Sequence, residues 1–434
     1  MIPLFMDAEL AYLFRHGLIR DAAYELQTPS SRAALHALAL QLLENVFGGA
    51  PNWPDPNTPL PRHATDPYAD ELAFHAKAAQ SGASAPVDGL GRAEALYLWR
   101  AASWAEFRAN PVLAIEYFQK LAAHAAAPPA VRVLAARSAG WLLHTIGRSG
   151  PGREHLEAAL KDAEAAGLEL EPARIIGVLG LLLQDIGQLE QSGAMLERAL
   201  VLQRRTGQRS DESRTLTYLA NVVLKSGQQD KALEMYQRAL AIAREVGDRR
   251  GQGVALANLG TALSQGGNHA EAESAYRQAL VVQRAIGNRR IEGIVLGNLA
   301  NLLDTQGQYD SAEDAYRQAI ALHHEYGNQR SAGFALGNLA GLYAATARPE
   351  LAEKAYQQAL ATHAQVGAKW SLAVHRCDYA LFKLRNGDAA GARELWLQGA
   401  DSLREIGDTG ELGRKADAMR RACDACAVKP FVDA

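Results

Sequence analysis

The sequence predicts an all-α protein, a right-handed solenoid of paired helices with an amino-terminal helical cap. Two series of glycines, each with a period of 40 residues between residues 129 and 408, mark the expected ends of the two helices in every repeat, with Ala347 replacing one glycine. Glycine is favoured there because it adopts the left-handed backbone of a helix C-terminus without strain. A fixed period of this length is typical of solenoids, whose units complete their cores against their neighbours.

The repeat 289–328 illustrates how each unit is built. Leucines at spacings of three and four predict the buried face of a first helix, which ends at Gly307. A second helix buries Ala312 and Tyr316 and stops at Gly327. The same tyrosine position recurs in four repeats, and we interpret this series as core because large aromatic side chains at a fixed helical spacing fill the space between units.

One repeat carries a pattern with wider parallels: Leu-x-x-Leu-Gly-x-x-Leu, a glycine, then Ala-x-x-x-Tyr-x-x-Ala. Its residues are Leu256, Leu259, Gly260, Leu263, Gly267, Ala272, Tyr276 and Ala279. This pattern resembles the tetratricopeptide repeat, and its 40-residue length resembles the long-helix variety. Segments such as ALAIAREVGDRRGQGVALANLG are similar to repeats of kinesin light chains and Pins-type adaptors. The resemblance implies an adaptor that binds peptides.

A second resemblance concerns the amino-terminal part. FRHGLIRDAAYELQ and SSRAALHALALQLLE resemble the end of the winged-helix-like region in bacterial signal-transduction ATPases of the STAND type, where it precedes tetratricopeptide repeats. The sequence contains no GxxxxGK[ST] phosphate loop, so the resemblance does not extend to ATPase activity. We expect this chain to be the carboxyl-terminal arm alone, as a stand-alone product or a shortened reading frame.

These patterns divide the chain into five expected segments. They are a helical segment resembling the end of the winged-helix-like linker (1–47), a proline-rich connector (48–68), helices with one or more degenerate repeats (69–128), seven regular repeats (129–408), and a capping helix with a tail (409–434).

Composition narrows the expected partners and location. The chain has 45 basic and 48 acidic side chains and a net charge of −3, which provides no overall attraction to nucleic acid or to anionic lipid. Three cysteines fit a reducing compartment, and the amino terminus lacks the basic region of a signal peptide. We therefore expect a cytoplasmic protein without a membrane or nucleic-acid partner, and the resemblance to bacterial signal-transduction ATPases implies a bacterial source.

Asparagines recur on the first helices, on the face opposite the packing leucines. They are Asn221, Asn258, Asn298, Asn301 and Asn338. Asparagine is a poor helix former, and in tetratricopeptide arrays this face lines the concave groove. One interpretation is that the amides bind the backbone of an extended peptide. The alternative, equally weighted, is that the family consensus favours asparagine here because it can bond to the neighbouring helix.

Basic residues recur where each first helix begins, beside this expected groove, which is centred on residues 209–345. They are Arg209, Arg249, Arg250, Arg289, Arg290, Arg330 and Lys369. Five amide hydrogen bonds supply roughly 2.5–7 kcal/mol, less than the about 8 kcal/mol of micromolar binding, so charges or apolar contacts must add to them. The arginines would attract an acidic segment. Alternatively, they pair with acids such as Glu245 and Asp248.

Other reactive residues provide no site. Cys423 and Cys426 follow the apolar spacing of the last helix, and we expect both to be buried. His323 and His324 are expected on the exterior, and Ser, His and Asp are too scattered to nominate a triad. We expect a binding scaffold without a cofactor, metal or catalytic activity. The alternative is a ligand-sensing regulatory arm with an ATPase or kinase as partner in trans, and an enzyme using CxxC ranks last.

Overall fold

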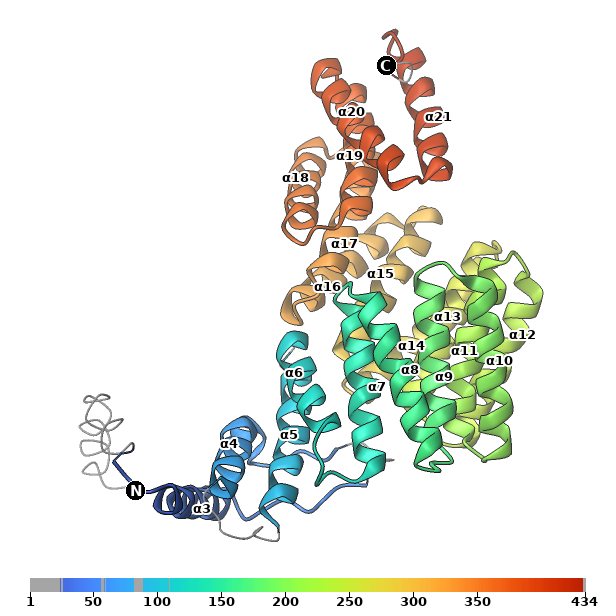
Figure 1. The fold of residues 1–434 in the computed structure, drawn as a ribbon. Coiled ribbons are helices and arrows are strands. Elements are labelled where there is room, and N and C mark those ends of the chain that lie inside the picture. Colours follow the sequence, from blue (N-terminus) through green and yellow to red (C-terminus); the bar gives the residue numbers. More distant parts are fainter. Residues whose placement is uncertain are drawn as a thin grey trace. The chain divides into compact units, whose positions relative to one another are not determined.

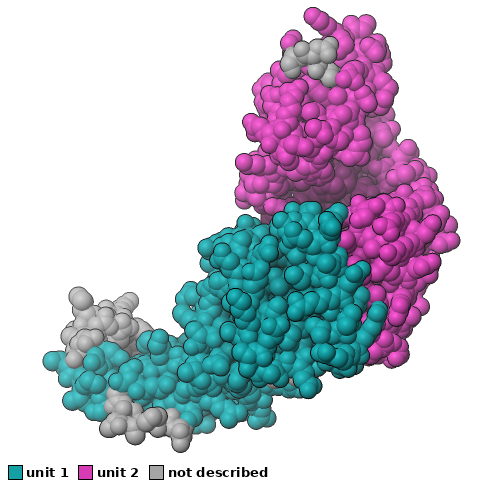
Figure 2. Space-filling view, turned by 45° about the vertical axis from the view of Figure 1, so that its right-hand side comes forward, with its two compact units in different colours: residues 1–208 teal, residues 209–434 magenta. Residues whose placement is uncertain are grey.

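The computed structural model describes residues 24, 26–55, 58, 60–81, 89–108 and 110–431. Within these ranges the chain consists of helices in tandem with no strand (Figure 1), which confirms the predicted all-α solenoid. Residues 1–23 of the predicted amino-terminal helical segment lie outside the described residues. The chain divides into two compact units, residues 1–208 and residues 209–434 (Figure 2), and the division coincides with the start of a repeat.

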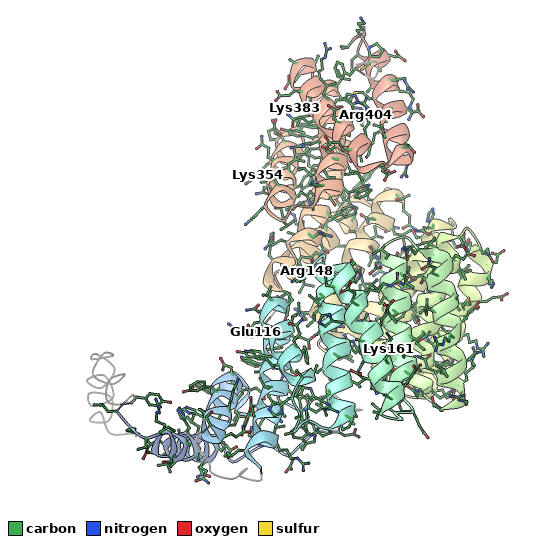
Figure 3. The ribbon with its side chains drawn as sticks, viewed as in Figure 1. Glu116, Arg148, Lys161, Lys354, Lys383 and Arg404 are labelled. Atoms are coloured by element: carbon green, nitrogen blue, oxygen red, sulfur yellow. The ribbon has the colours of Figure 1, made fainter. Side chains whose placement is uncertain are left out.

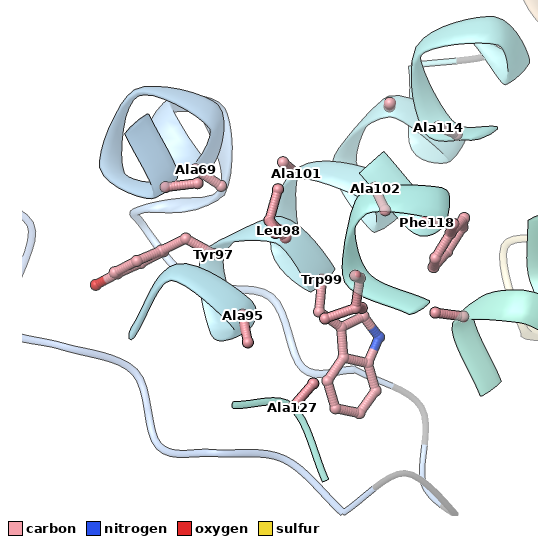
Figure 4. Packing of buried hydrophobic residues seen from close by; sticks show 14 of the residues in the cluster. Ala69, Ala95, Tyr97, Leu98, Trp99, Ala101, Ala102, Ala114, Phe118 and Ala127 are labelled. Carbon is pink, nitrogen blue, oxygen red and sulfur yellow. The ribbon is translucent and has the colours of Figure 1, made fainter. Parts of the chain in front are cut away.

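Unit 1 contains eight α-helices and one short 3-10 helix among its described residues. They are α3 (Pro29–Val46), η1 (Asp66–Tyr68), α4 (Ala69–Gln80), α5 (Leu90–Phe107), α6 (Pro111–Ala122), α7 (Pro129–Thr145), α8 (Ser149–Ala165), α9 (Glu171–Asp185) and α10 (Leu189–Arg205). Tyr97, Trp99 and Phe118 lie in a hydrophobic core formed by α4–α7 (Figure 4). Arg100 and Asp66 form a buried ion pair of 2.7 Å, which ties the proline-rich segment to α5.

Unit 2 continues the helix pairs with the predicted period. Its helices are α11 (Arg209–Lys225), α12 (Gln229–Glu245), α13 (Arg249–Gln265), α14 (His269–Ala285), α15 (Arg289–Thr305), α16 (Tyr309–Glu325), α17 (Gln329–Ala345), α18 (Pro349–Gln365), α19 (Lys369–Arg385), α20 (Ala389–Ile406) and α21 (Thr409–Ala425). The odd-numbered helices α11–α19 contact one another from repeat to repeat. These first helices therefore form one layer, and the second helices α12–α20 form the other.

The turn between repeats explains the regular spacing. Gly247 has a φ of 71° and ends α12, and Asp248 then accepts a hydrogen bond of 2.8 Å from the backbone N–H of Gly251 in the first turn of α13. Asn288 and Asn328 cap α15 and α17 in the same way. A left-handed residue followed by a capping side chain ends one helix and starts the next, so the sequence fixes a turn of constant length.

Small residues at equivalent positions are buried in both units, and aromatic residues at equivalent positions are buried in unit 2. We call a set of residues at the same position of successive repeats a column. The alanine column is fully buried: Ala159, Ala199, Ala239, Ala279, Ala319 and Ala359. The tyrosine column is buried as predicted: Tyr236, Tyr276, Tyr316 and Tyr356. The alanines allow close approach of the helices, and the tyrosine rings fill the space between them.

Two expectations about burial are wrong in part. Cys423 is fully buried against the core of α19–α21, but Cys426 is exposed because it lies at the C-terminus of α21, beyond the covered part of that helix. His323 is buried rather than exterior. Its column contains Gln203, Ala243, Gln283 and His363, all of which are buried, whereas the exterior column one residue later contains His324.

Candidate peptide-binding groove

A pocket of about 240 Å³ opens between the first helices α15 and α17 of unit 2. Its lining residues come mostly from these two helices, with single contributions from α19 and two from α16. They are Ile294, Gly297, Asn298, Asn301, Tyr316, His323, Arg330, Ser331, Phe334, Ala335, Asn338 and Ser371. We call this feature the α15–α17 pocket, and the side of α13, α15 and α17 that carries the asparagines and arginines the groove face.

The pocket brings together four of the residues singled out from the sequence. Asn298, Asn301, Asn338 and Arg330 all line it. Asn258 occupies the same column as Asn298 and Asn338 and is half-buried on α13, but it does not line this pocket. Asn221 lies farther along unit 2, on α11.

Hydrogen bonds within the pocket orient two of the amides. The hydroxyl of Tyr316 and the side-chain nitrogen of Asn338 both donate to Oδ1 of Asn301, over 2.6 and 2.8 Å. A carbonyl oxygen accepts two hydrogen bonds at most in this geometry. The amide N–H groups of Asn301, together with the Oδ1 and the second N–H of Asn338, are therefore left to bind a ligand. Asn221 accepts from Tyr236 in the equivalent way, so part of the asparagine pattern has the structural role that the alternative interpretation described.

The first basic column is largely engaged within the protein. Arg209 contacts Glu212 and Glu245 over 2.6 and 2.7 Å, and hydrogen bonding to these carboxylates raises the pKa of Arg209. Arg289 pairs with Glu292 over 2.8 Å. Arg249, in the same column, donates to the side-chain oxygen of Gln252 over 3.3 Å. Lys369 lies exposed at the start of α19. The alternative interpretation, in which the arginines pair with nearby acids, therefore holds for Arg209 and Arg289.

The second basic column differs. Arg250, Arg290 and Arg330 are exposed at the starts of α13, α15 and α17, and none of them has an ion-pair or hydrogen-bond partner within the part of the chain that the structure describes. Three unpaired guanidinium groups therefore repeat along one edge of the groove face. Because no acid offsets them, they are available to an external anion.

Sequence reasoning missed three lining residues that shape the pocket. His323 reaches the pocket from α16 because Gly293 has no side chain, and a Cβ at Gly293 would lie 3.0 Å from Cε1 of His323. Burial lowers the pKa of His323, so it is neutral at pH 7. Phe334 is 37% exposed and provides an apolar wall, and Gly297 provides open space opposite. The glycine at residue 297, inside a helix pattern, was the available signal.

One Ser–His–Asp contact forms in unit 1, although the sequence made these residues look too scattered. His144 contacts Ser149 through Nδ1 over 2.9 Å and Asp185 through Nε2 over 3.0 Å. Ser149 begins α8 five residues after His144, and the Asp185 side chain is 42% exposed. We interpret the contact as closure of the turn between α7 and α8, tied to α9.

The described residues contain neither a membrane-spanning helix nor a cluster of metal ligands. No helix there combines the length and apolar character needed to cross a membrane. Within the same residues, histidine, cysteine and carboxylate side chains do not gather in groups of three or more that could hold a metal ion.

Comparison with known families decides which repeat this is. The family model described as "Tetratricopeptide repeat" matches residues 171–245, 251–325 and 293–365. The chain is a tetratricopeptide-repeat protein. None of the curated proteins matches its sequence.

Solved structures share the fold of this tetratricopeptide-repeat protein at low identity. A Rap protein complexed with Competence and Sporulation Factor has a TM-score of 0.54 at 14% identity, covering 92% of this chain and 99% of that one. A Rap conjugation gene regulator in complex with a Phr peptide has a TM-score of 0.54 at 16% identity, covering 80% and 93%. A STAND protein with a tetratricopeptide repeat sensor from Pyrococcus horikoshii has a TM-score of 0.55 at 18% identity, covering 80% of this chain and 55% of that one.

Proposed function

We propose that this tetratricopeptide-repeat protein is a scaffold that binds an extended, acidic segment of a partner protein along the groove face within residues 209–345, without catalysis of its own. The observation that carries the proposal is the unpaired column Arg250, Arg290 and Arg330 beside the asparagine-lined pocket. Two of the similar structures are of proteins complexed with a peptide or factor, which agrees with this use of the fold.

The chemistry of the groove face favours a backbone ligand. Asn301 presents N–H donors and Asn338 presents a carbonyl acceptor, which together match the C=O and N–H groups of an extended chain. The arginines add long-range attraction, which speeds encounter with an acidic segment and weakens at high salt.

The test begins with peptides selected from a display library on the full chain. Their affinities are then measured for the wild type, for a variant with Arg250→Gln, Arg290→Gln and Arg330→Gln, and for a charge-matched control. The control carries Arg238→Gln, Arg277→Gln and Arg404→Gln on the second helices (Arg404 is labelled in Figure 3). We expect the groove variant to lose affinity by about tenfold or more and the control by less than about twofold.

An equal loss of affinity in both variants would mean that only the net charge matters, and it would contradict binding along the groove face. The regulatory-arm alternative differs in its partner, an ATPase or kinase acting in trans, and the sequences of the selected peptides would distinguish it by matching such a protein. The experiment therefore tests the binding face first and the class of partner second.

A further inference from the structure

We infer that the α15–α17 pocket is the anchor of the groove face. It takes one apolar side chain of the bound segment between Gly297 and Phe334, while Arg330 binds a carboxylate adjoining that side chain. The carboxylate is either the free C-terminus of the segment or the side chain of a neighbouring aspartate or glutamate. This inference rests on the proposed function, because it assigns the chemical class of ligand at one point of the same face.

Gly297 lines the pocket, and the fold does not explain why a glycine occupies this position. It lies in the middle of α15, and its φ is not positive, so the backbone requires no glycine there. A Cβ added at Gly297 would meet no atom within 4 Å. A glycine inside a helix is less favourable than alanine because its backbone loses more freedom on folding, and here no packing contact offsets that cost.

Most other glycines inside the first helices of unit 2 have a packing reason; Gly341, where an added Cβ would meet only the hydroxyl of Tyr356 at 3.8 Å, is an exception. At five of them, a Cβ would approach a side chain of a neighbouring helix to 3.0 Å or less: Gly253, Gly260, Gly293, Gly333 and Gly337. Gly337 is the closest comparison, because it occupies the same column as Gly297 and faces His375 at 2.3 Å. The contrast indicates that Gly297 is kept small by the space in front of it, which is the pocket.

The walls of this space suit one apolar side chain. Ile294, Phe334 and Ala335 line it, and its volume of about 240 Å³ is below the about 300–1,000 Å³ of sites that enclose drug-sized ligands. In the preceding repeat, Ala257 and Ile294 occupy the positions of Gly297 and Phe334. The substitution of both residues in adjacent repeats would explain why the pocket forms between α15 and α17.

The charge around the pocket favours a carboxylate next to the apolar side chain of the bound segment. None of its lining residues is acidic, and Arg330 is the one lining residue that is cationic at pH 7. Along α17, Arg330, Phe334 and Asn338 follow one another at intervals of four residues, so they lie on one stripe about 12 Å long. A segment lying along this stripe meets an amide, then an apolar wall, then a guanidinium group.

Three small probes separate the parts of the inference. They are N-acetylphenylalanine, its carboxamide, and the dipeptide N-acetyl-Phe-Asp-amide. Their affinities are measured by ligand-observed NMR on the full chain, on Gly297→Phe, which fills the pocket, and on Arg330→Gln. Gly413→Phe is the control, because Gly413 is exposed on α21 with no atom within 4 Å of an added Cβ.

We expect at least one of the two acidic probes to bind about tenfold or more tightly than the carboxamide, Arg330→Gln to abolish that preference, and Gly297→Phe to abolish binding. Gly413→Phe should bind as the wild type does. Preference for N-acetylphenylalanine identifies a C-terminal carboxylate, and preference for the dipeptide identifies a side-chain carboxylate. Equal binding of all three probes, unchanged binding to Gly297→Phe, or no binding of any probe would overturn the inference.

Failure here is distinguishable from failure of the proposed function. If selected peptides bind the groove face and depend on the three arginines, but bind Gly297→Phe as tightly as the wild type, then the anchor is wrong and the scaffold role stands. If the probes bind in the pocket but the affinity of the selected peptides does not depend on the three arginines, then the pocket assignment stands and binding along the extended groove face is wrong.

Discussion

His363 and His375 stack in unit 2 with their ring centroids 5.1 Å apart, and Nε2 of His363 lies 3.0 Å from Nδ1 of His375. Both imidazoles pack against α17 where Gly333 and Gly337 leave room for them. The helix that forms one wall of the α15–α17 pocket therefore rests on this histidine pair.

The pair makes the stability of unit 2 dependent on pH. Burial lowers the pKa of His375 to about 3 and also lowers that of His363. An unfolded histidine has a pKa of about 6.5, so below that pH the unfolded chain binds protons that the folded chain does not. We expect the urea midpoint to decrease as the pH falls from 6.5 towards 3. His375→Gln should reduce this slope, and His324→Gln, on the exterior, should not. A slope unchanged in His375→Gln would contradict the assignment.

Gly297 and Gly337 should respond in opposite directions to the same substitution. Gly297→Ala should raise stability by about 0.5–1 kcal/mol, because the helix gains propensity and the Cβ enters open space. Gly337→Ala should lower stability by about 1–3 kcal/mol, because the Cβ would meet His375 at 2.3 Å. Urea denaturation of the two variants beside the wild type measures both effects. Destabilisation by Gly297→Ala would mean that the pocket is smaller than described.

The bond between Tyr316 and Asn301 should be worth more than an ordinary surface contact. Asn301→Ala leaves the half-enclosed hydroxyl of Tyr316 without its acceptor, and we expect a loss of about 1–3 kcal/mol. Tyr316→Phe should restore part of that loss in the double variant, since it removes the orphaned hydroxyl. Tyr356→Phe is the control, because the hydroxyl of Tyr356 faces Gly341 instead of an asparagine. Additive losses in the double variant would show that the two side chains are not coupled.

Thiol titration should count one reactive cysteine in the native protein. Cys426 is exposed, whereas Cys377 and Cys423 are buried. Burial raises the pKa of Cys377 to about 12, so it carries almost no thiolate at pH 8. Ellman's reagent should therefore react rapidly with one thiol, and with all three after denaturation. The Cys426→Ser variant should show no rapid reaction.

The fold could be read from the sequence because its information is local and repeated. Gly247 and Asp248 determine one turn by backbone conformation and capping, and the same pair of roles recurs every 40 residues. The burial of the alanine and tyrosine columns could be predicted for the same reason, because their positions recur in every repeat. The error at His323 came from assigning it to its neighbour's column, which shows that a shift of one residue moves a helical side chain from the surface to the core.

The candidate site was predictable only in part. Asn298, Asn301 and Asn338 were found because asparagine is unusual in the middle of a helix, and Arg330 was found because basic residues recur at its position in successive repeats. The local spacing already held the signal for pairing, because Glu212 and Glu292 follow Arg209 and Arg289 by three residues on the same helix. Arg250, Arg290 and Arg330 have no acid three or four residues later. Pocket depth depends on Phe334 and Gly297 together, and that pairing exists only after the helices have packed.

Constant turn length also makes the recognition surface modular. Ala257, Ile294 and Arg290 occupy the positions that Gly297, Phe334 and Arg330 hold one repeat later. Because the repeats have the same length, Ala257→Gly would open space beside Ile294, next to Arg290. A protein built this way can acquire, move or lose a specificity contact by single substitutions, without any new loop and without disturbing the array that supports it.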